Sequence, residues 1–133
     1  MIYLTALELL KEQLQSAREL FSGTVADITT DQLHEDPGGK AFPLGATYAH
    51  LVFSEDVLVQ QMIQHKEPLF KSSMKNKTGA DKPMPEWDAN WETTNHEWSK
   101  TVKIDLEMLK EYEKAVYTAT DEYLSSISDE DLD

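Results

Sequence analysis

Apolar residues recur at helical spacing near the start of the chain. Between Leu4 and Ile28 they fall three or four residues apart, at Leu7, Leu10, Leu14, Ala17, Phe21, Val25 and Ile28. This spacing places them on one face of a helix that packs against other helices. It predicts a helix near residues 2–27, with a water-facing side made of Glu8, Lys11, Glu12, Gln13, Arg18 and Glu19. The sequence at 29–32 supplies turn and capping groups after it.

A second helix is predicted near residues 43–64, after a loop. The loop around His34–Lys40 contains a proline and two glycines, which oppose both helix and strand. The apolar residues of the helix are spread around most of its circumference, at Tyr48, Leu51, Val52, Val57, Leu58, Val59, Met62 and Ile63. A helix that is apolar nearly all round is typical of one buried by neighbours on several sides.

The middle of the chain is predicted to be a long crossing loop. Residues 66–82 carry five lysines, and prolines and a glycine interrupt them. The lysines are expected to keep this loop in water. All three tryptophans, Trp87, Trp91 and Trp98, follow within twelve residues. They either line a ligand pocket or cap the end of a helical core, and the pattern leaves both interpretations open.

A third long helix is predicted near residues 95–126. Thr94 and Glu97 have the spacing of a capping box, which places the start of the helix near Asn95. The apolar stripe then continues through Val102, Leu106, Leu109, Val116, Tyr123 and Ile127. Glu113 falls inside this stripe, so its carboxylate either serves a function or turns toward solvent. A second capping box at Ser128 to Asp131 predicts a helical stub, and the sequence ends at Asp133.

Composition narrows the class of protein. A chain of 133 residues with 40% hydrophobic side chains is one domain, 1–133, with one core. The formal charge of −13 repels phosphate backbones, which argues against nucleic-acid partners. We expect a cytoplasmic protein without membrane partners, because the sequence has no long apolar run and no basic leader. The absence of cysteine excludes disulfides, thiolate metal sites and cysteine nucleophiles.

His50 is the candidate site residue. It lies on the second predicted helix, where Phe53 and Val57 are its neighbours one and two turns away. A buried imidazole needs either a hydrogen-bond partner or a metal, so His50 is either a satisfied core histidine or a metal ligand. The other histidines, His34, His65 and His96, form no His-x-x-x-His pair with it or with one another.

Two stretches carry a resemblance to a known family. Residues 45–56, Gly-Ala-Thr-Tyr-Ala-His-Leu-Val-Phe-Ser-Glu-Asp, resemble the second helix of DinB-like proteins. The positions from Trp98 through Leu109, Tyr112 and Val116 to the acidic segment 128–133 resemble the third helix and its end. The resemblance implies an all-α, DinB-like up-and-down helical bundle. Three long helices are expected here, with the fourth missing or truncated and the domain incomplete at its C-terminal end.

The resemblance also implies a function. DinB-like proteins usually hold a divalent metal, zinc or nickel, with three histidines at one end of the bundle. The first corresponds to His50, and the other two form a His-x-x-x-His pair in the fourth helix that this sequence lacks. Family members include hydrolases and S-transferases that use low-molecular-weight thiols. The first hypothesis is therefore a metal-dependent transferase or hydrolase acting on a thiol or another small molecule, although one imidazole is expected to bind metal poorly.

The second hypothesis is a non-catalytic DinB-like module that binds a small ligand or dimerises without metal. In this interpretation His50 is a core residue. Three helices with apolar inner faces leave a groove uncovered, and an exposed apolar patch favours association. We therefore expect a homodimer, and the sequence leaves open whether the chain is an enzyme.

Overall fold

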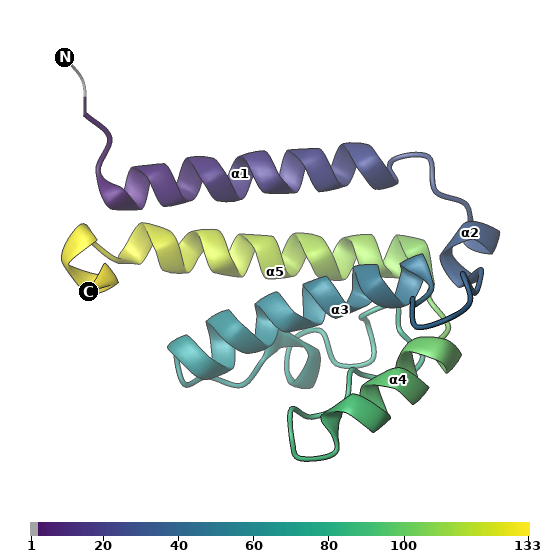
Figure 1. Cartoon of the computed structure of the whole chain (residues 1–133). Helices are drawn as coiled ribbons and strands as arrows, with labels where there is room; N and C mark the ends of the chain where they lie inside the picture. Colours follow the sequence, from purple (N-terminus) through teal and green to yellow (C-terminus); the bar gives the residue numbers. More distant parts are fainter. Residues whose placement is uncertain (1–2) are drawn as a thin grey trace.

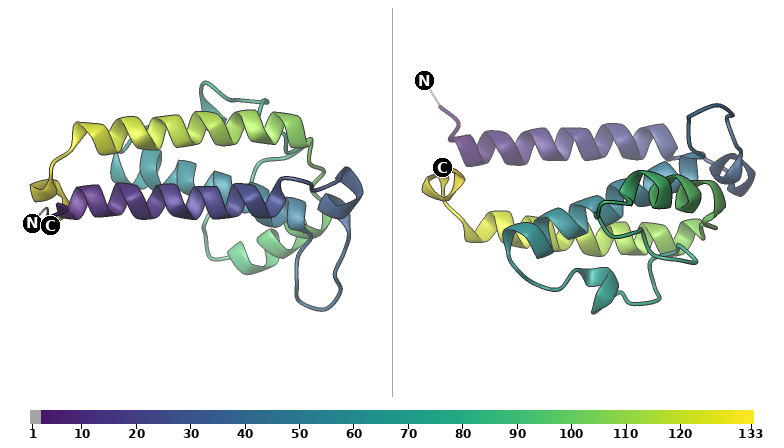
Figure 2. Two further views of the ribbon diagram at one scale, coloured as in Figure 1. Left: turned by 90° about the horizontal axis from the view of Figure 1, so that it is seen from above. Right: turned by 60° about the horizontal axis from the view of Figure 1, so that its bottom comes forward.

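The computed structural model describes residues 3–133, and these residues form an all-α protein, as predicted (Figure 1). The elements in chain order are α1 (Ala6–Val25), α2 (Thr30–His34), α3 (Leu44–Asp56), the π-helical η1 (Val57–Ile63), η2 (Leu69–Lys71), α4 (Trp91–Thr101), α5 (Leu106–Ser126) and η3 (Asp129–Leu132). The successive helices α1, α3, α4 and α5 alternate in direction, and the two chain ends lie at the same end of the bundle (Figures 1 and 2). In the part of the chain that the structure describes, no helix is long and apolar enough to cross a membrane.

Three of the helical starts are encoded locally. Thr5 and Glu8 form a capping box at the start of α1, so the helix begins at Ala6; the predicted start at residue 2 lies outside the described residues. Thr29 and Gln32 form the same motif before α2, in the segment predicted to supply capping groups. The capping box predicted at Ser128 is confirmed, and it starts the short η3 turn.

Helix α3 is the centre of the fold. It contacts α2, α4 and α5, and its continuation η1 completes the predicted helix 43–64. Its buried face joins a core that includes Leu33, Phe53, Leu109, Tyr112 and Val116. Gly45 allows α2 to approach closely, because a Cβ atom there would lie 2.8 Å from the Leu33 carbonyl oxygen.

The outer face of α3 is uncovered. Leu44 and Leu51 of α3 and Leu58 of its continuation η1 are spaced seven residues apart, and each is between 43% and 55% exposed. The prediction that neighbours bury this helix on several sides is therefore wrong for this face. The tertiary contacts of α3 lie instead on its faces toward α2, α4 and α5 and, through Tyr48 and Glu55, toward α1.

The predicted helix 95–126 is two helices. Helix α4 begins earlier, at Trp91, and Thr94 lies inside it, donating a hydrogen bond to the Asn90 carbonyl oxygen (3.1 Å) rather than capping a start. The helix ends before Val102, and α5 begins after Asp105, whose side chain caps it. The stripe of apolar residues thus continues through a break that the spacing did not show.

Backbone pairing with the crossing segment explains the break. The Asp81 amide donates to the Lys103 carbonyl oxygen (3.0 Å), and the Asp105 amide donates to the Gly79 carbonyl oxygen (2.7 Å). Gly79 has φ +84°, and a Cβ atom there would lie 2.4 Å from the Leu109 backbone nitrogen. These contacts hold residues 102–105 in an extended conformation. The tertiary contacts therefore override the helical spacing of apolar residues that predicted one continuous helix.

A buried carboxylate holds the crossing segment 66–84 against the core. Asp56 is fully buried, and it accepts hydrogen bonds from the Leu69 amide (2.9 Å), the Phe70 amide (3.0 Å) and the Tyr112 hydroxyl (2.7 Å). Burial raises the pKa of Asp56, and these three donors oppose that shift. Since all three partners donate, the ionised carboxylate is the form that satisfies them.

We predict that Asp56→Asn destabilises the protein by about 2–4 kcal/mol, because an amide cannot accept from all three donors and leaves buried groups unpaired. Chemical denaturation monitored by circular dichroism measures the change. The exposed Asp27→Asn is the matched control and should alter the free energy of unfolding by less than about 0.5 kcal/mol. Equal effects of the two substitutions would contradict the anchoring role of Asp56.

Candidate functional site

His50 lies at the edge of the buried face of α3, next to the start of α4. Its ring is 5.9 Å from the ring of Trp91, and its Nε2 atom is 3.5 Å from the Ser54 hydroxyl oxygen. The Ser54 hydroxyl in turn donates toward the sulfur of Met84 (4.0 Å). The Nδ1 atom is buried and has no hydrogen-bond partner among the described residues. Only one of the two ring nitrogens of His50 therefore has a hydrogen-bond partner within the described part of the protein.

Burial controls the protonation of His50. Desolvation lowers the pKa of this imidazole, because no neighbouring carboxylate compensates for the loss of water around a charged ring. The ring is consequently neutral at physiological pH. The Ser54 hydroxyl carries one hydrogen, so Nε2 either accepts that hydrogen or donates its own to the hydroxyl oxygen, and Nδ1 has no partner within residues 3–133 in either tautomer.

The surroundings of His50 do not fit the metal site that the resemblance implies. Its neighbours are a hydroxyl, an indole ring and a thioether. Within residues 3–133, no group of three His, Cys, Asp or Glu side chains is placed to hold a metal ion. Catalytic zinc sites normally use three protein ligands, so His50 is at most one ligand of such a set.

The remaining histidines have other surroundings. His34 ends α2, where its Nδ1 bonds to the Thr30 carbonyl oxygen (2.9 Å) and its Nε2 accepts from the Ile104 amide (2.9 Å). These bonds fix the linker between α4 and α5. His96 lies in the middle of α4 rather than in a first turn, and its ring packs edge-on against Phe42 (5.6 Å). His65 has φ +56° directly after the η1 helix, in agreement with the predicted loop.

The three tryptophans have three different environments. Trp98 is a core residue, and its indole nitrogen donates to the Lys82 carbonyl oxygen (2.9 Å). Trp91 lies beside His50, and Trp87 packs edge-on against Trp91 at 6.0 Å. Trp87 also lines a small cavity next to α3. Trp98 therefore belongs to the core, whereas the ligand-pocket interpretation of Trp87 stays a prediction.

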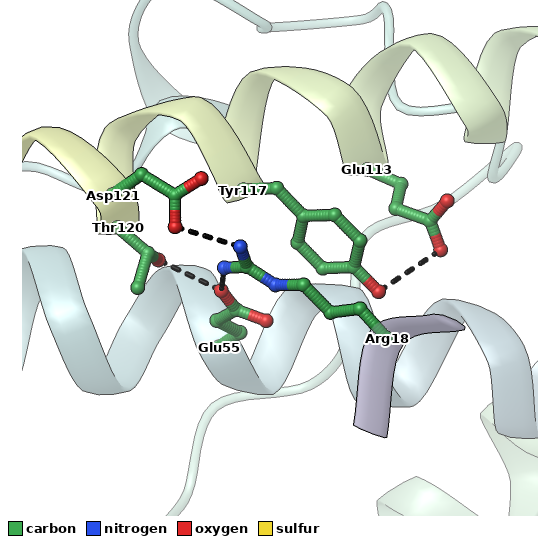
Figure 3. Close-up of polar contacts among 6 residues, drawn as sticks. All are labelled: Arg18, Glu55, Glu113, Tyr117, Thr120 and Asp121. Carbon is green, nitrogen blue, oxygen red and sulfur yellow. Dashed lines mark hydrogen bonds and ion pairs between the residues drawn. The ribbon is translucent and has the colours of Figure 1, made fainter. Parts of the chain in front are cut away.

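A second polar site, the Arg18 cluster, joins α1 to α3 and α5 (Figure 3). Arg18 donates to Glu55 on α3 (3.0 Å) and to Asp121 on α5 (2.7 Å). Its guanidinium lies 4.1 Å from the centre of the Tyr117 ring. Burial disfavours the charged guanidinium, but the hydrogen bonds and charges of Asp121 and Glu55 outweigh it and raise the pKa of Arg18.

Two further groups extend the cluster. Thr120 donates to Glu55 (2.8 Å), and the Tyr117 hydroxyl donates to Glu113 (3.3 Å). Glu113 is half-buried, so the carboxylate singled out in the sequence points into the bundle and is engaged there. Burial and Glu113 also raise the pKa of Tyr48 and of Tyr117, which keeps both phenols neutral. No group in the cluster is an activated nucleophile, and its role is to fasten α1.

The sequence interpretation missed Arg18 and placed it on the water-facing side of the first helix. Its side chain is 10% exposed. The sequence did contain a signal for the burial of Arg18. Arg18 follows Leu14 by four residues and precedes Phe21 by three, so it lies on the same face as the apolar stripe. A cation on that stripe requires acidic partners, but the pattern does not say which acids supply them.

We predict that the free energy of unfolding falls as the pH is lowered from about 7.5 to about 5, partly through His50. Because the pKa of His50 is lowered in the folded state, the unfolded chain binds more protons in this range, and stability rises with pH. His50→Leu should reduce the loss on acidification, while His96→Gln at an exposed position should leave it unchanged. Denaturant unfolding at both pH values checks this, and an unchanged loss in His50→Leu would refute it.

Comparison with known proteins identifies the family. None of the curated proteins or solved structures searched matches this chain. A family profile described as the DinB superfamily matches residues 13–133, which include α3 with His50 and the whole of α4 and α5. The match spans most of the chain and agrees with the all-α architecture. The chain therefore belongs to the DinB superfamily.

Proposed function

We propose that this DinB-superfamily chain is a non-catalytic cytoplasmic module that pairs with a second copy of itself through the outer face of α3. The observation that carries the proposal is the heptad-spaced row Leu44, Leu51 and Leu58, each 43–55% exposed. We call this row the α3 stripe. Leucines seven residues apart lie on one line along a helix and are suited to packing against another helix.

The distribution of charge supports self-association at this face. Residues 44–63 contain only two charged side chains, Glu55 and Asp56. Glu55 is paired with Arg18, and Asp56 is fully buried. In a chain with a formal charge of −13, the α3 stripe is thus a surface without free charge.

The strongly acidic segment of the chain lies outside α3. Residues 104–133 hold ten acids and two lysines, and α5 packs on α3 around Phe53 and Asp56. Charges separated by more than about 8 Å are largely screened at physiological salt, so this segment opposes pairing only where the two copies bring it closer than that. A twofold axis across the stripe also makes the two α3 helices antiparallel, which is favourable for their dipoles.

We predict that the chain sediments at twice its 15.2 kDa mass at micromolar concentration, and that Leu51→Glu shifts it to the monomer. A carboxylate in the middle of the stripe would be buried without a partner in the dimer. Sedimentation velocity measures both states.

Leu20→Glu provides the matched control. Leu20 is 75% exposed on α1, outside the stripe, and its substitution adds the same charge. This variant should remain dimeric. A wild-type monomer at micromolar concentration, or dissociation by Leu20→Glu as complete as by Leu51→Glu, would refute pairing through the stripe.

The second candidate function is a metal-dependent transferase or hydrolase that uses His50 as one ligand of zinc or nickel, with a low-molecular-weight thiol as substrate. Membership of the DinB superfamily supports it. So does the unpartnered Nδ1 atom of His50, because a neutral imidazole is the form that binds metals. The donors around His50 do not complete a metal site, so we rank this candidate second.

Elemental analysis separates the two candidates. For protein produced with zinc and nickel in the medium, the first candidate predicts no stoichiometric metal, because a lone imidazole binds too weakly. The second predicts a stoichiometric ion that His50→Ala removes while the helical circular dichroism is kept. Finding such a His50-dependent ion would replace the first candidate by the second.

A further inference from the structure

A small cavity lies between the end of α3 and the crossing segment. Its volume is about 220 Å³, and six of its lining residues are apolar, aromatic or sulfur-containing: Val57, Met62, Phe70, Met84, Pro85 and Trp87. Gln61 and Glu86 complete the lining. For comparison, an apolar cavity of about 150 Å³ suffices to bind benzene. The space is thus that of a single substituted ring.

The inner wall of the cavity is fixed by the rest of the fold. The Phe70 amide is bonded to Asp56 (3.0 Å), and its ring packs edge-on against Phe53 at 5.1 Å. Met84 is buried and receives the Ser54 hydroxyl. Because these contacts are made within the protein, they order the inner wall beforehand, which reduces the entropic cost of binding.

The rim is exposed and adaptable. Met62 is 54% exposed and Trp87 is 42% exposed, so both side chains have room to move over an occupant. Methionine is flexible and polarisable, and its sulfur makes favourable contacts with aromatic rings. An indole offers a ring for edge-to-face packing. This pair of rim residues favours an aromatic occupant.

The one charged side chain among the described residues that line the cavity, Glu86, forms an ion pair. Glu86 is paired with Lys71 at 2.8 Å, so its carboxylate is not a free partner for a cation. The Gln61 amide is the remaining polar group of the lining, and it can accept or donate one hydrogen bond to a substituent. A charged ligand would have to break the ion pair or lose its hydration without compensation.

We propose that this cavity is a binding site for an uncharged, single-ring aromatic molecule carrying one small polar substituent. The ring lies between Phe70 and Met84 on the fixed wall and Met62 and Trp87 on the rim. The hydroxyl or carbonyl substituent reaches Gln61. His50 does not line this cavity, although Ser54 connects it to Met84 of the wall, and binding there does not depend on pairing or on metal.

Titration of the full chain with para-cresol, observed through isotope-labelled methionine methyl groups, tests the site. The methyl resonances of Met62 and Met84 should shift together with one dissociation constant. The methyl of Met108, which is exposed on α5 and outside the cavity, should not follow them. This measurement uses the unsubstituted protein, so it shows whether para-cresol binds in the cavity even where a variant does not fold.

Matched variants sharpen the test. Met62→Trp fills the mouth and should weaken para-cresol binding by about tenfold or more, whereas Met108→Trp should leave the affinity within about twofold. Glu86→Gln should also leave it within about twofold, because the ligand is uncharged. The absence of a saturable shift at Met62 and Met84, or equal shifts at Met108, would overturn the proposal. Tetramethylammonium producing the same shifts in place of para-cresol, with loss in Glu86→Gln, would overturn it in favour of a cation site.

Discussion

The buried carboxylate of Asp56 is the interaction on which much of this structure depends. It stands where α3 becomes the π-helical η1, and its donors come from both of the segments that follow: Leu69 and Phe70 in the crossing segment and Tyr112 in α5. A fully buried charge is costly unless its oxygens are satisfied. The three segments are therefore held in one arrangement, and the wall of the cavity beside Phe70 is a consequence of it.

The attachment of α1 follows a different physical rule. Only Leu7 of this helix is fully buried, so apolar packing contributes less here than it does around α3. Arg18 compensates by reaching two acids on two different helices, and Tyr117 covers its guanidinium (Figure 3). Such pairs orient helices well, but their desolvation cost limits the stability that they add. The α1 helix is thus attached by the ion pairs of Arg18 together with the apolar contacts that Phe21 and Val25 make with the core.

Helix α3 divides the possible functions among its faces. Its buried face builds the core, and its edge toward α4 carries His50 beside Trp91. Its outer face is the α3 stripe, and its η1 continuation borders the aromatic cavity. The same helix carries the resemblance to the DinB superfamily, although His50 lacks the companions that a metal site requires in the described residues. Pairing and the binding of an aromatic ligand are therefore the activities that we propose for these surfaces.

The sequence by itself determined the features that depend on near neighbours. The helical class, the helix at 43–64 and the capping box at Ser128 all follow from residues three or four apart, whose contacts are made within one helix. The sequence also singled out His50, because a buried imidazole on an apolar helix needs a partner, and its role as a metal ligand stays a prediction.

Only the tertiary structure decided what depends on residues distant in the chain. The break between α4 and α5 arises from pairing with Gly79 and Asp81, more than twenty residues earlier, and the local stripe contains no trace of it. The partners of Arg18 lie on α3 and α5, and those of Asp56 lie in η2 and α5. The exposure of one side of α3 also depends on how the other helices are arranged around it. The apolar character of a residue does not specify which residue packs against it. The spacing of apolar residues shows which side of a helix is apolar. Which other segment packs against that side is determined by tertiary contacts.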